Sequence, residues 1–279
     1  MKKNRVFKFR YGTENDFDAL FENYIWFADF SSLNDPFEGY VRFIENGVED
    51  KLRYEFFSQA IQDNQPHTKT HNIESINPSK DIDALAKKEF QRRHKNYRKN
   101  YFTLSLSLDK GDHPLHPSPL NDLQMWAHYA NGFKGYCIDF DLEKLNESIK
   151  ENLSNEEREP RLGQGRVKYL QGSFPEVNLK TLMEDYLNGN TNSSYEILDA
   201  FNAKECGWQH ENELRLTSTK RGKHYYNPFC INAIYIAGNM PSWAKSNITS
   251  AIEQKNSEIS LFEVTLHDSE YKLGFEQMK

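Results

Sequence analysis

A late stretch of the chain, residues 207–215, brings together two glutamates, a histidine, a tryptophan and an arginine. We predict a strand over residues 210–217, whose two-residue period places Glu211, Glu213 and Arg215 on one face. Carboxylates two residues apart on a strand are separated by about 7 Å, so each can raise the pKa of the other and both can act on one substrate. The alternative is a solvated face of an edge strand whose acids pair with Arg215.

Two other predicted strands carry polar side chains that could serve the same site. In residues 6–11, aromatic side chains alternate with basic ones, so we expect Arg10 to point away from the apolar face. In residues 101–108, Phe and Leu side chains alternate with a row of hydroxyls that includes Ser105 and Ser107.

The rest of the pattern predicts the elements that position these residues. Gly12 ends the first strand, and Thr13 with Asp16 predicts the N-terminal cap of a helix. Further strands are expected at residues 24–28, 136–141, 167–170, 231–237 and 259–266, and further helices at residues 121–130, 179–204 and 241–254. Because the helices do not follow a regular βαβ cadence, we expect a single α+β domain over residues 1–279 with an antiparallel or mixed sheet and a helical insertion at about residues 48–100.

The composition excludes several classes of protein. The 279 residues have a formal net charge of −6 and a mean hydropathy of −0.83, and no stretch is apolar enough to span a membrane. The first residues run into a predicted strand rather than an apolar signal core, so we expect a cytoplasmic protein. The three cysteines are widely spaced and the histidines form no ligand motif, so neither a disulfide framework nor a metal site is predicted.

A basic segment, residues 87–99, holds Lys and Arg side chains with a single acidic residue and interleaved aromatic rings. Its candidate contacts to a nucleic-acid backbone are Arg92, Arg93, Lys95, Arg98 and Lys99. The alternative is a solvated helix face that balances the acidic remainder of the chain.

The order of these features resembles the ADP-ribosyltransferase superfamily. The matching features are Arg10 followed by Gly-Thr on the first strand, Ser105 and Ser107 on a middle strand, a helix with Tyr129 leading into a strand, and the Glu-x-Glu of Glu211 and Glu213. In that superfamily these positions line an NAD cleft.

The whole chain also resembles an uncharacterised bacterial family, number 2971 among the domains of unknown function. The motifs that carry this resemblance are Phe9-Arg10, Asn34-Asp35-Pro36-Phe37-Glu38, Met125-Trp126-Ala127-His128-Tyr129-Ala130, Gly135-Tyr136-Cys137-Ile138, Lys204 with Trp208, His210-Glu211-Asn212-Glu213-Leu214-Arg215, and Tyr271-Lys272-Leu273. This family implies no established activity, although its members often accompany bacterial defence loci.

The transferase resemblance implies a set of roles for an enzyme that uses NAD. Glu213 would stabilise the oxocarbenium-like ribose, and Glu211 would orient or deprotonate the acceptor. Arg10 would hold the pyrophosphate or the adenosine ribose, Ser105 or Ser107 the nicotinamide-side ribose, and Tyr129 would stack on the nicotinamide. The protein would then be a bacterial toxin or a phage-defence effector, with an acceptor that is either protein or nucleic acid.

Two other functions stay open. The first is a noncatalytic module of a defence system that binds nucleic acid through residues 87–99, or a protein through its aromatic surface. The second is a metal-dependent nuclease built on Asp35, Glu38, Glu211 and Glu213, although the lysine that such a motif places after its acids is replaced by Arg215.

Overall fold

The structure, a computed structural model, describes residues 4–63, 95, 98–109, 118–154, 160–190, 200–255 and 258–278. The chain divides into two compact units. The first unit comprises Met1–Asp29, Tyr101–Val167 and Gly207–Lys279, and the second comprises Phe30–Asn100 and Lys168–Cys206. The segment predicted as an insertion therefore belongs to the second unit, together with a later part of the chain.

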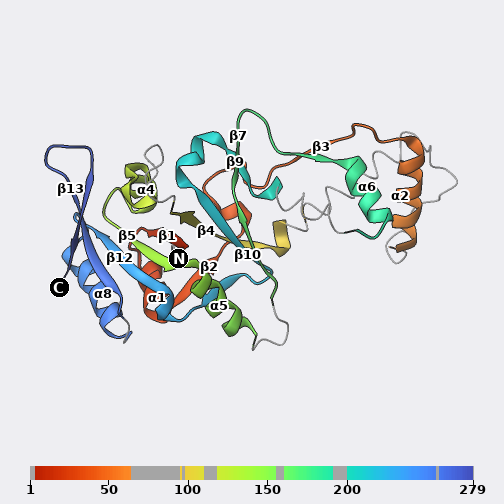
Figure 1. The fold of residues 1–279 in the computed structure, drawn as a ribbon. Helices are drawn as coiled ribbons and strands as arrows, with labels where there is room; N and C mark the ends of the chain where they lie inside the picture. Colours follow the sequence, from red (N-terminus) through yellow and green to blue (C-terminus); the bar gives the residue numbers. More distant parts are fainter. Residues whose placement is uncertain are drawn as a thin grey trace. The chain divides into compact units, whose positions relative to one another are not determined.

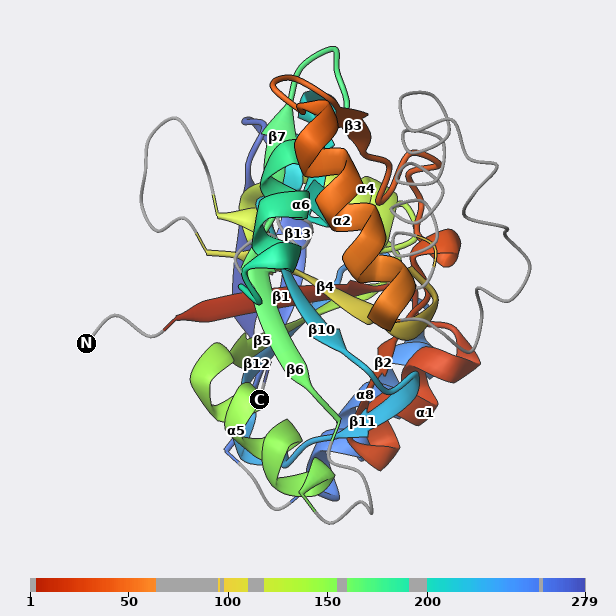
Figure 2. The ribbon, with the colours of Figure 1, turned by 90° about the vertical axis from the view of Figure 1, so that its right-hand side faces the viewer.

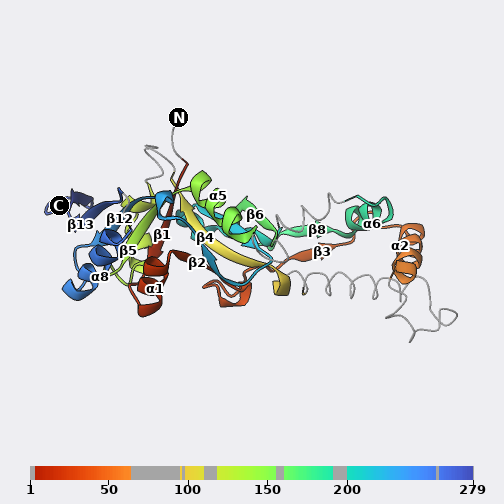
Figure 3. The ribbon, with the colours of Figure 1, turned by 90° about the horizontal axis from the view of Figure 1, so that it is seen from below.

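An eight-stranded mixed sheet forms the centre of the first unit, in the order β14-β13-β12-β5-β1-β4-β10-β6 (Figures 1 and 3). The strands are β1 (Arg5–Arg10), β4 (Phe102–Leu108), β5 (Tyr136–Asp141), β6 (Leu162–Arg166), β10 (Glu213–Ser218), β12 (Ile231–Ala237), β13 (Ser260–Leu266) and β14 (Leu273–Gln277). Within this sheet β12 and β13 pair in parallel and the other neighbours pair antiparallel. The helix α8 (Ser242–Glu253) connects the parallel pair, as a crossover requires. The prediction of an antiparallel or mixed sheet with interspersed helices is confirmed.

Both faces of this sheet are covered by apolar side chains. One core cluster joins Leu104, Leu106 and the alternate residues of β5 and β12 to side chains of α1 (Glu14–Glu22), α5 (Leu142–Leu153) and α8. A second cluster joins Phe7 and Phe9 to α4 (Leu123–Tyr129), whose Trp126 is 1% exposed. The burial of Leu104 and Leu106 confirms the predicted apolar face of β4.

Local sequence signals explain several of these elements. Thr13 accepts a hydrogen bond from the Asp16 backbone N–H, and the Asp16 carboxylate accepts one from the Thr13 N–H in return, so the predicted capping box opens α1. Asp122 caps α4 in a similar way through the Gln124 N–H. The predicted strand at residues 24–28 is β2 (Tyr24–Phe27), which pairs with β11 (Gly222–Tyr225).

The second unit contains two short parallel strand pairs and two packed helices. The pairs are β3 (Arg42–Ile44) with β8 (Glu176–Asn178) and β7 (Lys168–Leu170) with β9 (Ala203–Glu205). The helices are α2 (Asp50–Asp63) and α6 (Leu179–Leu187), which share a core around Phe56, Val177 and Leu182. The helix predicted over residues 179–204 is wrong in part: α6 ends at Leu187, residues 200 and 201 are helical, and residues 203–205 form β9.

Short 3-10 helices occur at η1 (Phe30–Ser32), η3 (Pro119–Asn121), η4 (Cys206–Glu211) and η5 (Pro228–Cys230), and residues 95, 98–100 and 200–201 are also helical. None of the helices in the described ranges is both long enough and apolar enough to cross a membrane.

Candidate functional site

Four of the predicted polar residues lie in one patch of the sheet in the first unit, where β10 runs between β4 and β6 (Figure 2). Glu213 lies opposite Ser107, and Arg215 lies opposite Ser105. Directly opposed residues of antiparallel strands project to the same face. The two serines and the Glu213–Arg215 pair therefore share one face of the sheet.

Glu213 and Arg215 form a two-point ion pair inside the fold. Arg215 Nε donates to Glu213 Oε1 at 2.8 Å, and Arg215 Nη2 donates to Oε2 at 3.2 Å. Their side chains are 4% and 0% exposed. The predicted pairing of a glutamate with Arg215 thus occurs in a buried internal strand and not on a solvated edge, and the guanidinium stabilises the ionised carboxylate in a fixed orientation.

Glu211 is positioned differently from the prediction. The predicted strand over 210–217 begins only at Glu213, because His210 and Glu211 belong to η4 and Asn212 has the left-handed backbone angle φ = 44°. The interpretation that both glutamates alternate along one strand is therefore wrong. The Tyr129 hydroxyl donates a hydrogen bond to Glu211 Oε1, which ties α4 to the end of η4.

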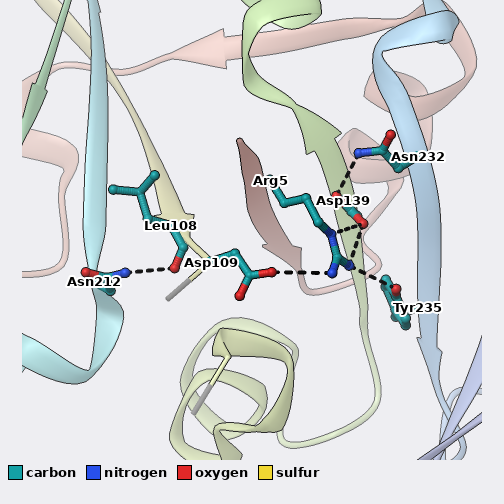
Figure 4. Close-up of polar contacts among 7 residues, drawn as sticks. All are labelled: Arg5, Leu108, Asp109, Asp139, Asn212, Asn232 and Tyr235. Carbon is teal, nitrogen blue, oxygen red and sulfur yellow. Dashed lines mark hydrogen bonds and ion pairs between the residues drawn. The ribbon is translucent and has the colours of Figure 1, made fainter. Parts of the chain in front are cut away.

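A hydrogen-bonded turn at Asn212 separates the two glutamates (Figure 4). Asn212 Nδ2 donates to Leu108 O at 2.8 Å, and the Leu108 N–H donates to Asn212 O at 2.9 Å. These bonds fasten the end of β4 to the residue between Glu211 and Glu213. Asparagine suits this position because it tolerates positive φ better than most residues.

Beside this patch, β1 and β4 share only a short stretch of strand pairing. β1 pairs with β4 at two positions only, whereas it pairs with β5 at six, and β4 pairs with β10 at six. Lys8 lies on β1 just past the last of the two pairs, and its Nζ donates to Ser105 O at 2.8 Å. A lysine side chain therefore bridges β1 and β4 where their ladder of backbone hydrogen bonds ends.

Lys8 is a partly exposed residue whose ammonium group has an unusual environment. Desolvation and, second to it, the positive charge of Arg10 lower the pKa of Lys8 from 10.5 to about 7. Glu213, Asp16 and Glu211 act in the opposite direction. The pKa of Lys8 therefore depends on the charges of both glutamates and of Arg10.

Arg10 has a nearby partner of its own. Its Nη1 lies 3.5 Å from Asp16 Oδ1, and the two side chains are 17% and 13% exposed. Asp16 Oδ2 also accepts from the Gly12 N–H, the Thr13 N–H and the Thr13 hydroxyl. The ion pair therefore holds Arg10 against the N-terminal cap of α1. The charges of Arg10 and Asp16 shift the pKa of Lys8 in opposite directions.

Aromatic and imidazole rings border Glu211. The prediction that His210 alternates along a strand is wrong, because this residue lies in η4. Its Nδ1 donates to Gly207 O at 3.2 Å. Its ring lies 6.2 Å from that of His128 and 6.3 Å from that of Trp208. Across the described ranges, no group of three or more His, Cys, Asp or Glu side chains could hold a metal ion.

The motifs around this patch connect the chain to a known family. Residues 125–216 match DUF2971, a family described as protein of unknown function. The match confirms the predicted resemblance to that family over the segment from α4 to β10. This segment holds Tyr129, Glu211 and Glu213, whereas Arg10 and Ser105 lie outside it. No curated protein and no solved structure matches the chain.

The remaining predicted residues belong to the second unit. Lys95 and Lys99 are exposed and Arg98 is half-buried, whereas Arg92 and Arg93 lie outside the described residues. Asp35 and Glu38, the two other acids of the nuclease alternative, also belong to the second unit, where both are buried. The Asp35 carboxylate accepts a hydrogen bond from the Phe37 N–H within a turn.

Lys8 was not among the predicted residues, although the alternation of β1 could have revealed it. It lies beside the patch but its side chain starts from the opposite face of the sheet, because Phe7 is the residue of β1 that pairs with Ser107. Lys8 and Arg10 are two residues apart on one strand, so a ligand that reaches one is near the other. What the sequence does not indicate is the loss of pairing between β1 and β4, which brings Lys8 to Ser105.

Proposed function

We propose that the first unit is an ADP-ribosyltransferase-like enzyme that cleaves NAD, with Glu213 as its central catalytic residue. The observation that carries this proposal is the buried Glu213 carboxylate, which Arg215 orients directly opposite Ser107. The Lys8 ammonium lies nearby, where β1 and β4 stop pairing, and donates to Ser105 O. This combination offers an anion for a developing ribosyl cation and a cation for a pyrophosphate.

Glu213 suits the ribosyl centre for electrostatic reasons. When the bond between nicotinamide and ribose breaks, the electron pair leaves with nicotinamide and positive charge develops on the ribose. A carboxylate held by Arg215 in advance stabilises that charge without reorganisation.

Glu211 takes the role of base for the acceptor. It receives the proton of the incoming nucleophile as that nucleophile bonds to the ribose carbon. The Tyr129 hydroxyl fixes the position of Glu211 from α4. Tyr129 in this proposal orients Glu211, in addition to the stacking on nicotinamide that the resemblance implies.

Lys8 and Arg10 hold the pyrophosphate. Lys8 donates one hydrogen bond, to Ser105 O, and has no ion-pair partner within the part of the chain that the structure describes. A desolvated ammonium with so little compensation gains strongly from an anionic ligand. Arg10 adds a second positive charge on the same strand, moderated by Asp16.

Nicotinamide release tests the proposal. Purified protein is incubated with NAD and cell extract as a source of acceptor, beside the variants Glu213→Gln and Glu211→Gln. We expect both variants to lose release, whereas Glu276→Gln, an exposed glutamate of β14 in the same unit, retains it.

The controls separate chemistry from folding. Glu213→Gln removes the carboxylate that pairs with the buried Arg215 guanidinium, so melting temperatures are measured in parallel. Glu211→Gln keeps an oxygen that the Tyr129 hydroxyl can reach. Undiminished release from a folded Glu213→Gln protein contradicts the assignment of Glu213. Absence of both NAD binding and release in the unaltered protein contradicts the proposal as a whole.

A further inference from the structure

The second unit contains a cavity of about 390 Å³ that the chemistry proposed for the first unit does not use. It is formed by the turn that holds Asp35 and Phe37, by the start of β3, by the loop between β7 and β8, and by β9. This volume lies in the range of small-ligand sites.

Three half-exposed aromatic rings line this cavity. Phe37, Tyr40 and Phe174 are 58%, 46% and 43% exposed. Phe174 stacks on Tyr40 with ring centroids 5.7 Å apart and an interplanar angle of 27°, and Phe37 lies 5.6 Å from Phe174. Aromatic side chains exposed together offer a surface on which a further flat ring can stack.

Positive charge borders the aromatic rings. The Arg98 guanidinium lies 5.5 Å from the centre of the Tyr40 ring. Lys99, next to Arg98, and Lys95, three residues before it, are exposed helical residues. Cations at the rim of a stacking surface are the arrangement by which proteins hold the phosphates of a nucleic-acid strand while its bases stack.

The wall of the cavity has a different character from its rim. Lys204 lies in the wall and pairs with Glu38 at 3.5 Å, with side chains 3% and 2% exposed. Asp35 and Glu205 are acidic residues of the same wall. Because these acids repel phosphate, the cavity favours a base with polar edge groups, and the phosphates belong outside beside Arg98.

We propose that this cavity binds a base of single-stranded nucleic acid, with the base stacked on Tyr40 and Phe174 and the strand's phosphates beside Arg98 and Lys99. A duplex does not fit, because its bases already stack on one another and are closed to a protein ring. The proposal does not depend on NAD chemistry in the first unit, so either can fail alone.

Fluorescence anisotropy of the full-length protein with a labelled single-stranded oligonucleotide tests this site. We expect Tyr40→Ala and Phe174→Leu each to weaken binding by roughly ten-fold or more, because one base loses its stacking partner. Tyr40→Phe keeps the ring and should bind as the unaltered protein does. Arg98→Gln should weaken binding and reduce by about one the slope of log affinity against log salt.

The matched control is Phe229→Ala in the first unit. Phe229 is 48% exposed and has the Lys144 ammonium 6.0 Å from its ring centre, so it too combines an exposed ring with a cation. We expect no change in affinity from this substitution. Circular dichroism melting shows whether each variant is folded at the temperature of the binding measurement.

Several outcomes overturn the proposal. Equal affinity for a duplex, or folded Tyr40→Ala and Phe174→Leu proteins that bind as the unaltered chain does, removes the stacking site. Absence of oligonucleotide binding at low salt does the same. Capture of a protein by the same aromatic residues, without oligonucleotide binding, would assign the cavity to a peptide instead.

Discussion

Asn212 and Leu108 exchange two hydrogen bonds that fix where β10 begins relative to the end of β4. The Asn212 side-chain amide donates one bond to Leu108 O, and the Asn212 backbone carbonyl accepts the other from the Leu108 N–H. The backbone at Asn212 is left-handed. Glu211 and Glu213 lie on either side of this residue. The geometry of both candidate catalytic carboxylates therefore depends on a residue that has no chemical role in the proposal.

Substitution of Asn212 tests this dependence. Asn212→Gly loses only the side-chain hydrogen bond, at a cost of about 1 kcal/mol in the free energy of unfolding. Asn212→Ala loses the same bond and, unlike Gly, keeps a Cβ in the left-handed region without the short polar side chain that lets asparagine adopt it, which costs about 1 kcal/mol more than Gly. Urea denaturation should rank the proteins as unaltered, Gly, then Ala. Equal stability of the Gly and Ala variants would contradict the backbone argument.

A polar cluster on the same sheet leads to a second prediction (Figure 4). Arg5 donates to Asp139 Oδ2 through Nε at 2.9 Å and through Nη2 at 2.7 Å, and also reaches Asp109 and Tyr235. Asn232 donates to the other Asp139 oxygen at 3.0 Å. Burial raises the pKa of Asp139, and Arg5 opposes that rise.

Arg5→Met should destabilise the protein by about 1–3 kcal/mol, because it leaves the buried Asp139 carboxylate with less compensation. Loss of Arg5 raises the pKa of Asp139 further, so the carboxyl binds a proton more readily in the folded variant. The loss of stability should therefore be smaller near pH 5 than near pH 8. Denaturation at both pH values checks this, and a loss that is independent of pH would show that Asp139 does not control it.

Sequence patterns predicted those elements that depend mainly on residues close together in the chain. The alternation of β1, the buried leucines of β4 and the Thr13–Asp16 cap all depend on residues within one element and its immediate neighbours. The burial of Leu104 and Leu106 followed from the same alternation.

The parts that were not predicted depend on distant contacts. β6 reads Leu-Gly-Gln-Gly-Arg and carries no apolar alternation, but it pairs with β10, where a Cβ at Gly163 would lie 2.8 Å from Thr217 Oγ1. The turn at Asn212 needs Leu108 as a partner from another strand. The bridge from Lys8 to Ser105 O exists only because β1 and β4 stop pairing, which no local pattern indicates.

The low pKa of Lys8 also affects stability, and the sign can be worked out. An unfolded chain holds this lysine at its ordinary pKa of 10.5, whereas the folded protein lowers it to about 7. Between these values the unfolded state binds more protons, so the contribution of Lys8 becomes less destabilising as pH rises. At lower pH the folded protein bears the full cost of a desolvated ammonium.

Lys8→Met removes that cost and keeps a side chain of similar length. We expect it to raise the melting temperature, and to raise it more near pH 6 than near pH 9. Lys223→Met is the control, since Lys223 is an exposed lysine paired with Glu22 in the same unit. Thermal melts of the three proteins at both pH values test this, and an equal gain at both pH values would argue against a lowered pKa.

NAD affinity should depend on pH through the same side chain if the proposed function is correct. A pyrophosphate binds the protonated ammonium, so the dissociation constant should rise as pH increases through about 7 and Lys8 loses its proton. Lys8→Arg keeps a positive charge at every pH in this range, because an arginine does not deprotonate there. Its affinity should therefore be independent of pH, while Lys8→Met should bind weakly throughout. Calorimetric titrations of NAD into the three proteins distinguish Lys8 from the neighbouring histidines, since a pH dependence that persists in Lys8→Arg would arise from another group.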